Sequence, residues 1–89
     1  MPAATLEELG KWFDEGVAQG ATHLIIMCDG FDFDDYPVFI MPGRSVREEV
    51  SLREKNSAES MQRVMEVYDL RMDKAAQLGE ERAFHLEEP

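Results

Sequence analysis

The sequence predicts a small α+β domain in which an antiparallel β-hairpin is packed by helices, in the order α-β-β-α-α. A chain of 89 residues has room for one core, so residues 1–89 are expected to form a single domain. A helical pattern of apolar residues opens the chain, and two short runs rich in β-branched and aromatic residues follow it. Because few residues connect these two runs, they are expected to pair as a hairpin and not through a crossover.

The first helix is predicted to begin after Thr5, because Glu8 follows three residues later and completes a capping box. Gly20 stands where a residue in the left-handed conformation would end the helix. The apolar residues between them recur at spacings of three and four, which predicts one buried stripe made of Leu6, Leu9, Phe13 and Val17.

Two strands are predicted next. The run from Thr22 to Cys28 reads as a buried strand, and its alternation places His23 and Cys28 on opposite faces. The run from Tyr36 to Met41 reads as the second strand, with Pro37 at its start or on a sheet edge, because proline lacks a backbone donor. Large apolar side chains occur on both faces of this hairpin, so its second face needs a further strand, a long loop or a partner chain. A homodimer is therefore expected as one solution.

The second half of the chain is predicted to be helical. Ser45 and Glu48 form a second capping box ahead of a short helix from about Val46 to Lys55. A longer helix is predicted from about Ala58, with Gly79 as its stop. Its buried stripe would consist of Met61, Met65, Tyr68, Met72 and Ala75, which recur at helical spacing. Residues 80–89 are expected to be a flexible tail or to dock as a small strand.

The net charge of the chain limits the classes of partner that it can bind. Nineteen acidic and nine basic residues give a formal net charge of −10, which argues against direct binding to nucleic acid or to anionic membranes. A basic protein surface, such as a host nucleoprotein complex, is the partner that this charge favours. One cysteine, no apolar run long enough to span a bilayer and no signal-peptide pattern are typical of a cytoplasmic protein.

The acidity is densest between the two predicted strands, where residues 29–35 hold four aspartates and no basic residue. Aromatic residues alternate with these carboxylates, a pattern that resembles an interaction hot spot facing arginine and lysine. The alternative is a solvated acidic loop whose rings simply close the end of the core. We predict that the partner-binding residues are Asp29, Phe31, Asp32, Phe33, Asp34, Asp35 and Tyr36, together with Glu7, Glu8, Asp14 and Glu15 of the first helix.

The same loop supports an alternative hypothesis, a divalent-metal site. Clustered carboxylate oxygens suit Mg²⁺ and Ca²⁺, and Asp29, Asp32 and Asp34 would be the ligands. The spacing is not that of an EF-hand, because glycine falls at the second position of the loop and Ile40 at the twelfth.

Catalytic motifs are not evident in the sequence. A lone cysteine such as Cys28 is more often a small core residue than a nucleophile. The two histidines are not spaced as zinc ligands, and the sequence has no glycine-rich phosphate loop. A non-catalytic protein without a cofactor is expected.

Several stretches resemble a small-protein family found in bacteriophages and prophages. The resemblance rests on residues 20–23, 28–29, 31–32 and 35–38, including the Cys-Asp and Asp-Tyr-Pro-Val strings, and on residues 61–68 and 82–85. It implies a viral or mobile-element origin, and by analogy of setting an anti-defence role such as that of anti-CRISPR proteins. The leading hypothesis is thus an acidic phage-derived inhibitor that mimics phosphates on a basic host protein; a small homo-oligomeric phage structural or regulatory protein is a further alternative.

Overall fold

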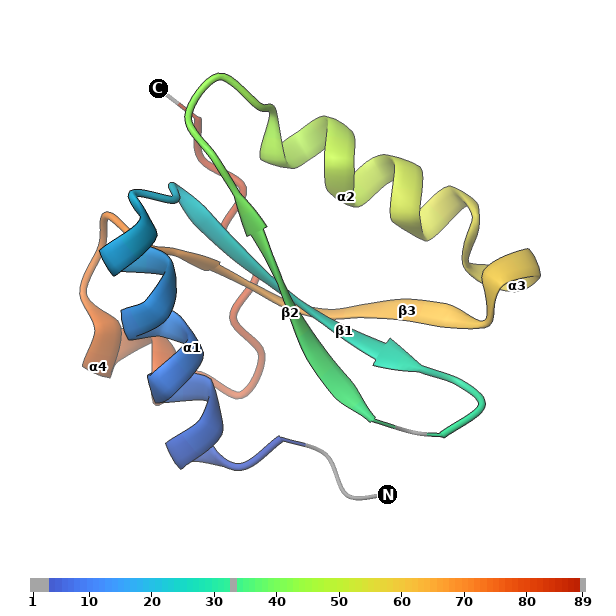
Figure 1. Cartoon of the computed structure of the whole chain (residues 1–89), viewed down its shortest axis with the longest axis horizontal. Helices are drawn as coiled ribbons and strands as arrows, with labels where there is room; N and C mark the ends of the chain where they lie inside the picture. Colours follow the sequence, from blue (N-terminus) through green and yellow to red (C-terminus); the bar gives the residue numbers. More distant parts are fainter. Residues whose placement is uncertain (1–3, 33, 89) are drawn as a thin grey trace.

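A three-stranded antiparallel sheet with helices on both faces forms the structure, a computed structural model that describes residues 4–32 and 34–88 (Figure 1). The strand order is β2-β1-β3, so β1 is central. The elements are α1 (Leu6–Gln19), β1 (His23–Asp29), β2 (Asp35–Ile40), α2 (Val46–Lys55), α3 (Ser57–Ser60), β3 (Gln62–Asp69) and α4 (Lys74–Leu78). The α+β class, the single domain and the β1–β2 hairpin are confirmed.

Helix α1 begins and ends where the sequence predicts. The Glu8 amide donates to the Thr5 hydroxyl oxygen at 3.1 Å, and the Thr5 amide donates to the Glu8 carboxylate at 3.2 Å. Gly20 closes the helix in the left-handed region, with φ of 81°. The buried stripe is narrower than predicted: Leu9 and Phe13 are buried, whereas Leu6 and Val17 are exposed.

Strand β1 is buried on both faces, and its alternation sorts the core into two clusters. Leu24 and Ile26 face α1 and α4, and Ile25 and Met27 face α2. Figure 1 shows α1 and α4 on one side of the sheet and α2 on the other. Pro37 lies in β2, an edge strand, as predicted.

The predicted long helix after Ala58 is wrong, because residues 62–69 form β3 and helix is confined to the short segments α3 and α4 on either side of it. A β-bulge explains the error. Ile26 pairs with Glu66 and Met27 pairs with Val64, so Met65 has no partner on β1. The extra residue places Met65 and Tyr68, two members of the predicted stripe, against the same core cluster at a spacing of three, which imitates a helix.

Helix α2 has the predicted bounds, but its capping differs from the prediction. The Ser45 hydroxyl accepts from the Glu48 amide at 3.2 Å, as expected. The carboxylate at this helix start belongs to Glu88 and not to Glu48. It accepts from the Ser45 hydroxyl at 2.6 Å and from the Arg47 amide at 2.9 Å. The end of the chain is thereby tied to the positive end of the α2 dipole.

The C-terminal segment (residues 80–88) docks, which is the second of the two predicted alternatives. The Val67 amide donates to the Ala83 carbonyl, and the His85 amide donates to the Val67 carbonyl, both at 2.9 Å. Together with α2, this segment covers the second apolar face of the hairpin. A homodimer would therefore need another surface, and the oligomeric state stays a prediction.

The β1–β2 loop is fixed against the start of β3 by a close backbone contact. The Gly30 amide donates to the Met61 carbonyl at 2.6 Å, and Met61 adopts the left-handed conformation with φ of 60°. A Cβ atom at position 30 would lie 2.4 Å from that carbonyl oxygen. Glycine is therefore required here by the closeness of the two chains.

We expect Gly30→Ala to lower the free energy of unfolding by about 1–3 kcal/mol, because the added methyl group forces the loop away from β3. Urea denaturation measures the change. Gly79→Ala is the matched control, because a Cβ atom there would come no closer than 3.5 Å to its neighbours. Equal stability of the two variants would contradict the contact.

Candidate functional site

The acidic loop between β1 and β2 is held at its base by backbone hydrogen bonds. The Asp29 amide donates to the Asp34 carbonyl at 2.9 Å and closes the loop. The Asp29 carboxylate accepts from the Phe31 amide at 2.8 Å, which makes an Asx turn. Asp29 therefore shapes the loop from a half-buried position. The prediction for Phe33 lies outside the described residues.

The tip of the loop carries an aromatic ring and two carboxylates into solvent. Phe31 is 72% exposed, so its ring does not close the core. Asp32 and Asp34 are exposed, and neither belongs to an ion pair among the residues that the structure describes. A large apolar side chain beside unneutralised carboxylates is a surface suited to an apolar and cationic partner.

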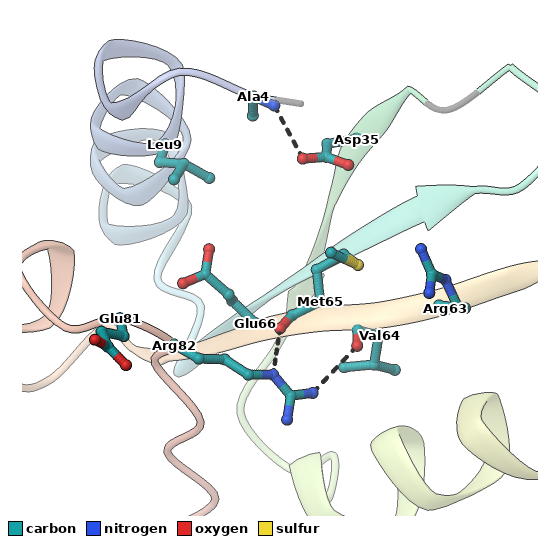
Figure 2. Close-up of a pocket in the computed structure, with 9 residues that line it drawn as sticks. All are labelled: Ala4, Leu9, Asp35, Arg63, Val64, Met65, Glu66, Glu81 and Arg82. Carbon is teal, nitrogen blue, oxygen red and sulfur yellow. Dashed lines mark hydrogen bonds between the residues drawn. The ribbon is translucent and has the colours of Figure 1, made fainter. Parts of the chain in front are cut away.

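Asp35 and Tyr36 are half-buried and contact other parts of the chain. The Asp35 carboxylate accepts from the Ala4 amide at 2.9 Å, which ties the residues that precede α1 to the start of β2 (Figure 2). The Tyr36 hydroxyl donates to the Gln62 side-chain carbonyl of β3. Tyr36 thus connects β2 to β3, whereas Asp35 joins the loop to the beginning of α1.

The four acidic residues predicted in α1 do not all join the loop. Glu7 and Glu8 lie in the first turn, near the Ala4–Asp35 bond, and the Glu8 carboxylate is occupied in the capping box. Asp14 lies farther along and forms an ion pair of 3.0 Å with Lys74 of α4. Glu15 is exposed next to Asp14. The predicted residues therefore fall into two groups. Glu7 borders the same surface hollow as Asp14 and Glu15. We name Phe31, Asp32, Asp34 and Asp35 the acidic end.

The metal alternative gains no support from this geometry. Within residues 4–32 and 34–88, no three His, Cys, Asp or Glu side chains lie close enough together to hold a metal ion. In particular, Asp29, Asp32 and Asp34 do not form such a group, since the Asp29 carboxylate turns toward the Phe31 amide.

A cavity of about 470 Å³ opens beside the acidic end, between α1, the start of β2 and β3 (Figure 2). Asp35 is the predicted residue that lines it. The other lining residues are Ala4, Leu9, Arg63, Val64, Met65, Glu66, Glu81 and Arg82. Sequence reasoning missed the β3 residues because it assigned them to a helix. The β-branched and aromatic side chains of Val64, Val67 and Tyr68 were the available signal for a strand.

A second group of polar side chains is buried at the opposite end of the sheet. His23 and Asp69 are each 1% exposed, and Gln77 of α4 is 3% exposed. The Asp69 amide donates to the Gln77 side-chain carbonyl at 2.7 Å, and the Gln77 side-chain amide donates to the Asp69 carbonyl at 2.8 Å. The group fixes α4 to β3 and gives a substrate no access.

His23 has one ring nitrogen in a hydrogen bond within this group. The Thr22 hydroxyl lies within hydrogen-bonding distance of the Ile40 carbonyl, at 3.3 Å, and of His23 Nδ1, at 2.9 Å. His23 Nε2 lies 3.7 Å from the Asp69 carboxylate and makes no hydrogen bond among the described residues. Arg71 holds both carboxylate oxygens of Asp69, at 2.9 and 2.8 Å. Burial lowers the pKa of His23, an effect that Asp69 opposes.

Cys28 is buried in strand β1, where it pairs with Asp35 of β2. Burial, and next to it the Asp35 carboxylate, raise the pKa of its thiol. The thiolate needed for nucleophilic chemistry is therefore disfavoured.

Comparisons with known proteins give no indication of a function for this chain. No family model, no curated protein and no solved structure matches the chain. The resemblance to a bacteriophage family stays a prediction. In the described part of the chain, no helix combines the length and the apolar character that a membrane span requires.

We predict that His23 makes the domain less stable in mild acid. The lowered pKa means that the unfolded chain binds this proton more readily than the native state, so stability is lost as the pH falls below about 6.5. His23→Gln removes this titration and keeps a side-chain hydrogen-bonding group for Thr22. Denaturation at about pH 7.5 and about pH 5.5 should therefore show a smaller loss for the variant than for the wild type.

His85→Gln is the matched control. The hydrogen bond that His85 donates to the Glu80 carboxylate raises the pKa of His85. The contribution of His85 to stability is therefore present in acid and is lost as the pH rises through that raised pKa. This variant should therefore lose more stability in acid than the wild type does. Identical pH slopes for the three proteins would contradict the assignment.

Proposed function

We propose that the protein is a non-catalytic binding protein whose acidic end docks on a basic protein surface that otherwise receives phosphate. The observation that carries the proposal is the loop tip, where exposed Phe31 precedes the exposed carboxylates of Asp32 and Asp34, which form no ion pair in the described chain. The proposal includes a nucleic-acid-binding host complex as the target and inhibition by phosphate mimicry as the mechanism.

The arrangement of charge supports this choice of partner. Asp69, Glu49 and Asp14 are paired with Arg71, Arg53 and Lys74, and so part of the acidity is neutralised within the fold. Asp32 and Asp34 are left to face solvent on a loop whose base is fixed by Asp29 and Gly30. Fixed carboxylates attract a cationic surface over a Debye length of about 10 Å and raise the association rate.

Phe31 supplies the apolar part of the proposed contact. When a partner covers an exposed aromatic ring, apolar surface leaves water and the complex is stabilised. The rigid side chain loses little conformational entropy on binding. The combination favours a protein surface that has apolar as well as cationic groups, because apolar groups cover the ring while the cationic groups meet the carboxylates.

We expect Asp32→Asn/Asp34→Asn to weaken binding of a fluorescent nona-arginine peptide about fivefold at about 50 mM salt, as the loss of two exposed charges predicts. The difference should disappear at about 0.5 M salt, where the Debye length is only a few ångströms. Fluorescence anisotropy measures both affinities.

The matched control is Glu54→Gln/Glu59→Gln, which removes the same charge from exposed residues of α2 and α3. It should weaken binding much less. If the two double variants bind alike at low salt, the attraction belongs to the net charge of −10, and the acidic end is not the site.

A further inference from the structure

The cavity beside the acidic end has an apolar interior with carboxylates from two different strands. Leu9 of α1 and Met65 of β3 supply apolar surface on two sides of it. Asp35 reaches it from β2 and Glu66 from β3, and Figure 2 shows their side chains bordering the open space between α1 and the sheet. A volume of about 470 Å³ falls within the usual range of ligand sites.

The hydrogen bonds of the lining residues leave acceptor capacity in the cavity. Asp35 Oδ2 accepts from the Ala4 amide at 2.9 Å, and the Cys28 thiol, a weak donor, is the other hydrogen-bonding group beside this carboxylate. Glu66 accepts one bond on each oxygen, from the Tyr68 hydroxyl and from the Ala83 amide. Because a carboxylate has about four acceptor positions, both groups can accept more donors.

The two arginines of the lining do not neutralise these carboxylates. Arg82 donates to the Met65 carbonyl at 2.8 Å and to the Val64 carbonyl at 3.3 Å, and it lies over the Phe84 ring. Figure 2 shows its guanidinium group turned along β3 toward those carbonyls. Arg63 is exposed, and among the described residues it lies within 4.0 Å of no carboxylate oxygen.

We propose that this cavity binds one arginine side chain of the basic partner. The inference rests on the proposed function and names the contact that gives it specificity. The aliphatic stem of the arginine lies along Leu9 and Met65, and its guanidinium group donates to Asp35 and Glu66. Arginine fits better than lysine, because its planar head carries five donors in a fixed geometry and can bridge two acceptors.

The position of the cavity allows one partner to contact the loop tip and to place an arginine in the cavity at the same time. Asp35 lines the cavity and also ends the acidic loop, so an arginine held there places the neighbouring residues of the partner beside Asp34 and Phe31. The exposed loop accelerates association, and the enclosed guanidinium slows dissociation, because a charge-assisted hydrogen bond away from water is worth more than an exposed one.

The test uses two small probes of equal shape, N-acetyl-arginine amide and N-acetyl-citrulline amide, and follows the backbone amides of the full chain by NMR. The arginine probe should shift the amides of Val64, Met65 and Ala4 in a saturable manner, and the neutral citrulline probe should not. Asp35→Asn should weaken the arginine probe at least about fivefold, while it keeps an acceptor for the Ala4 amide.

Met65→Trp fills the cavity and should abolish these shifts, whereas Met72→Trp at an exposed position should leave them unchanged. Binding of the nona-arginine peptide separates the two proposals. If Met65→Trp binds the peptide normally while Asp32→Asn/Asp34→Asn binds it weakly, the cavity proposal fails and the proposed function stands. Equal shifts with citrulline, or shifts confined to the loop, overturn the cavity proposal as well.

Discussion

The structure depends on the burial of β1 on both faces at once. Four consecutive apolar residues, Leu24 to Met27, are at most 1% exposed, and each such side chain stabilises the fold by about 1.5–3 kcal/mol relative to an exposed one. A strand of this kind needs a layer on each face and a hydrogen-bonded neighbour at each edge. Helices α1 and α2 and strands β2 and β3 meet those four needs, and the C-terminal segment completes the layer beside α2.

The two ends of β1 differ in their chemistry. At its beginning, His23 joins Asp69 and Gln77 in a polar group that is closed to solvent and that holds α4 in place. At its end, Asp29 begins a loop whose carboxylates and aromatic ring face outward. Polar groups that stabilise the fold are therefore separated from polar groups that are available to a partner, so substitutions at the loop tip can change binding without disturbing the core.

Local signals made the chain predictable as far as the end of α2, and a non-local feature made β3 unpredictable. The capping box at Thr5 and the alternation of β1 act over a few residues and can be read directly. The bulge at Met65 arises only when β3 pairs with β1, and it turns the spacing of two into a spacing of three. The carboxylates of the loop were predictable from composition, but the cavity was not, since its β3 wall depends on that pairing.

Arg82 and the segment that follows it have a consequence for the behaviour of the protein at high concentration. The guanidinium group and the backbone of Ala83 and His85 occupy carbonyl and amide groups along the outer edge of β3. On the other edge strand, Pro37 has no amide to offer a neighbouring strand. Proteolytic removal of residues 80–88 would expose the β3 edge and create a template for cross-β aggregation. By occupying the β3 edge, the segment therefore opposes polymerisation, in addition to burying part of the core.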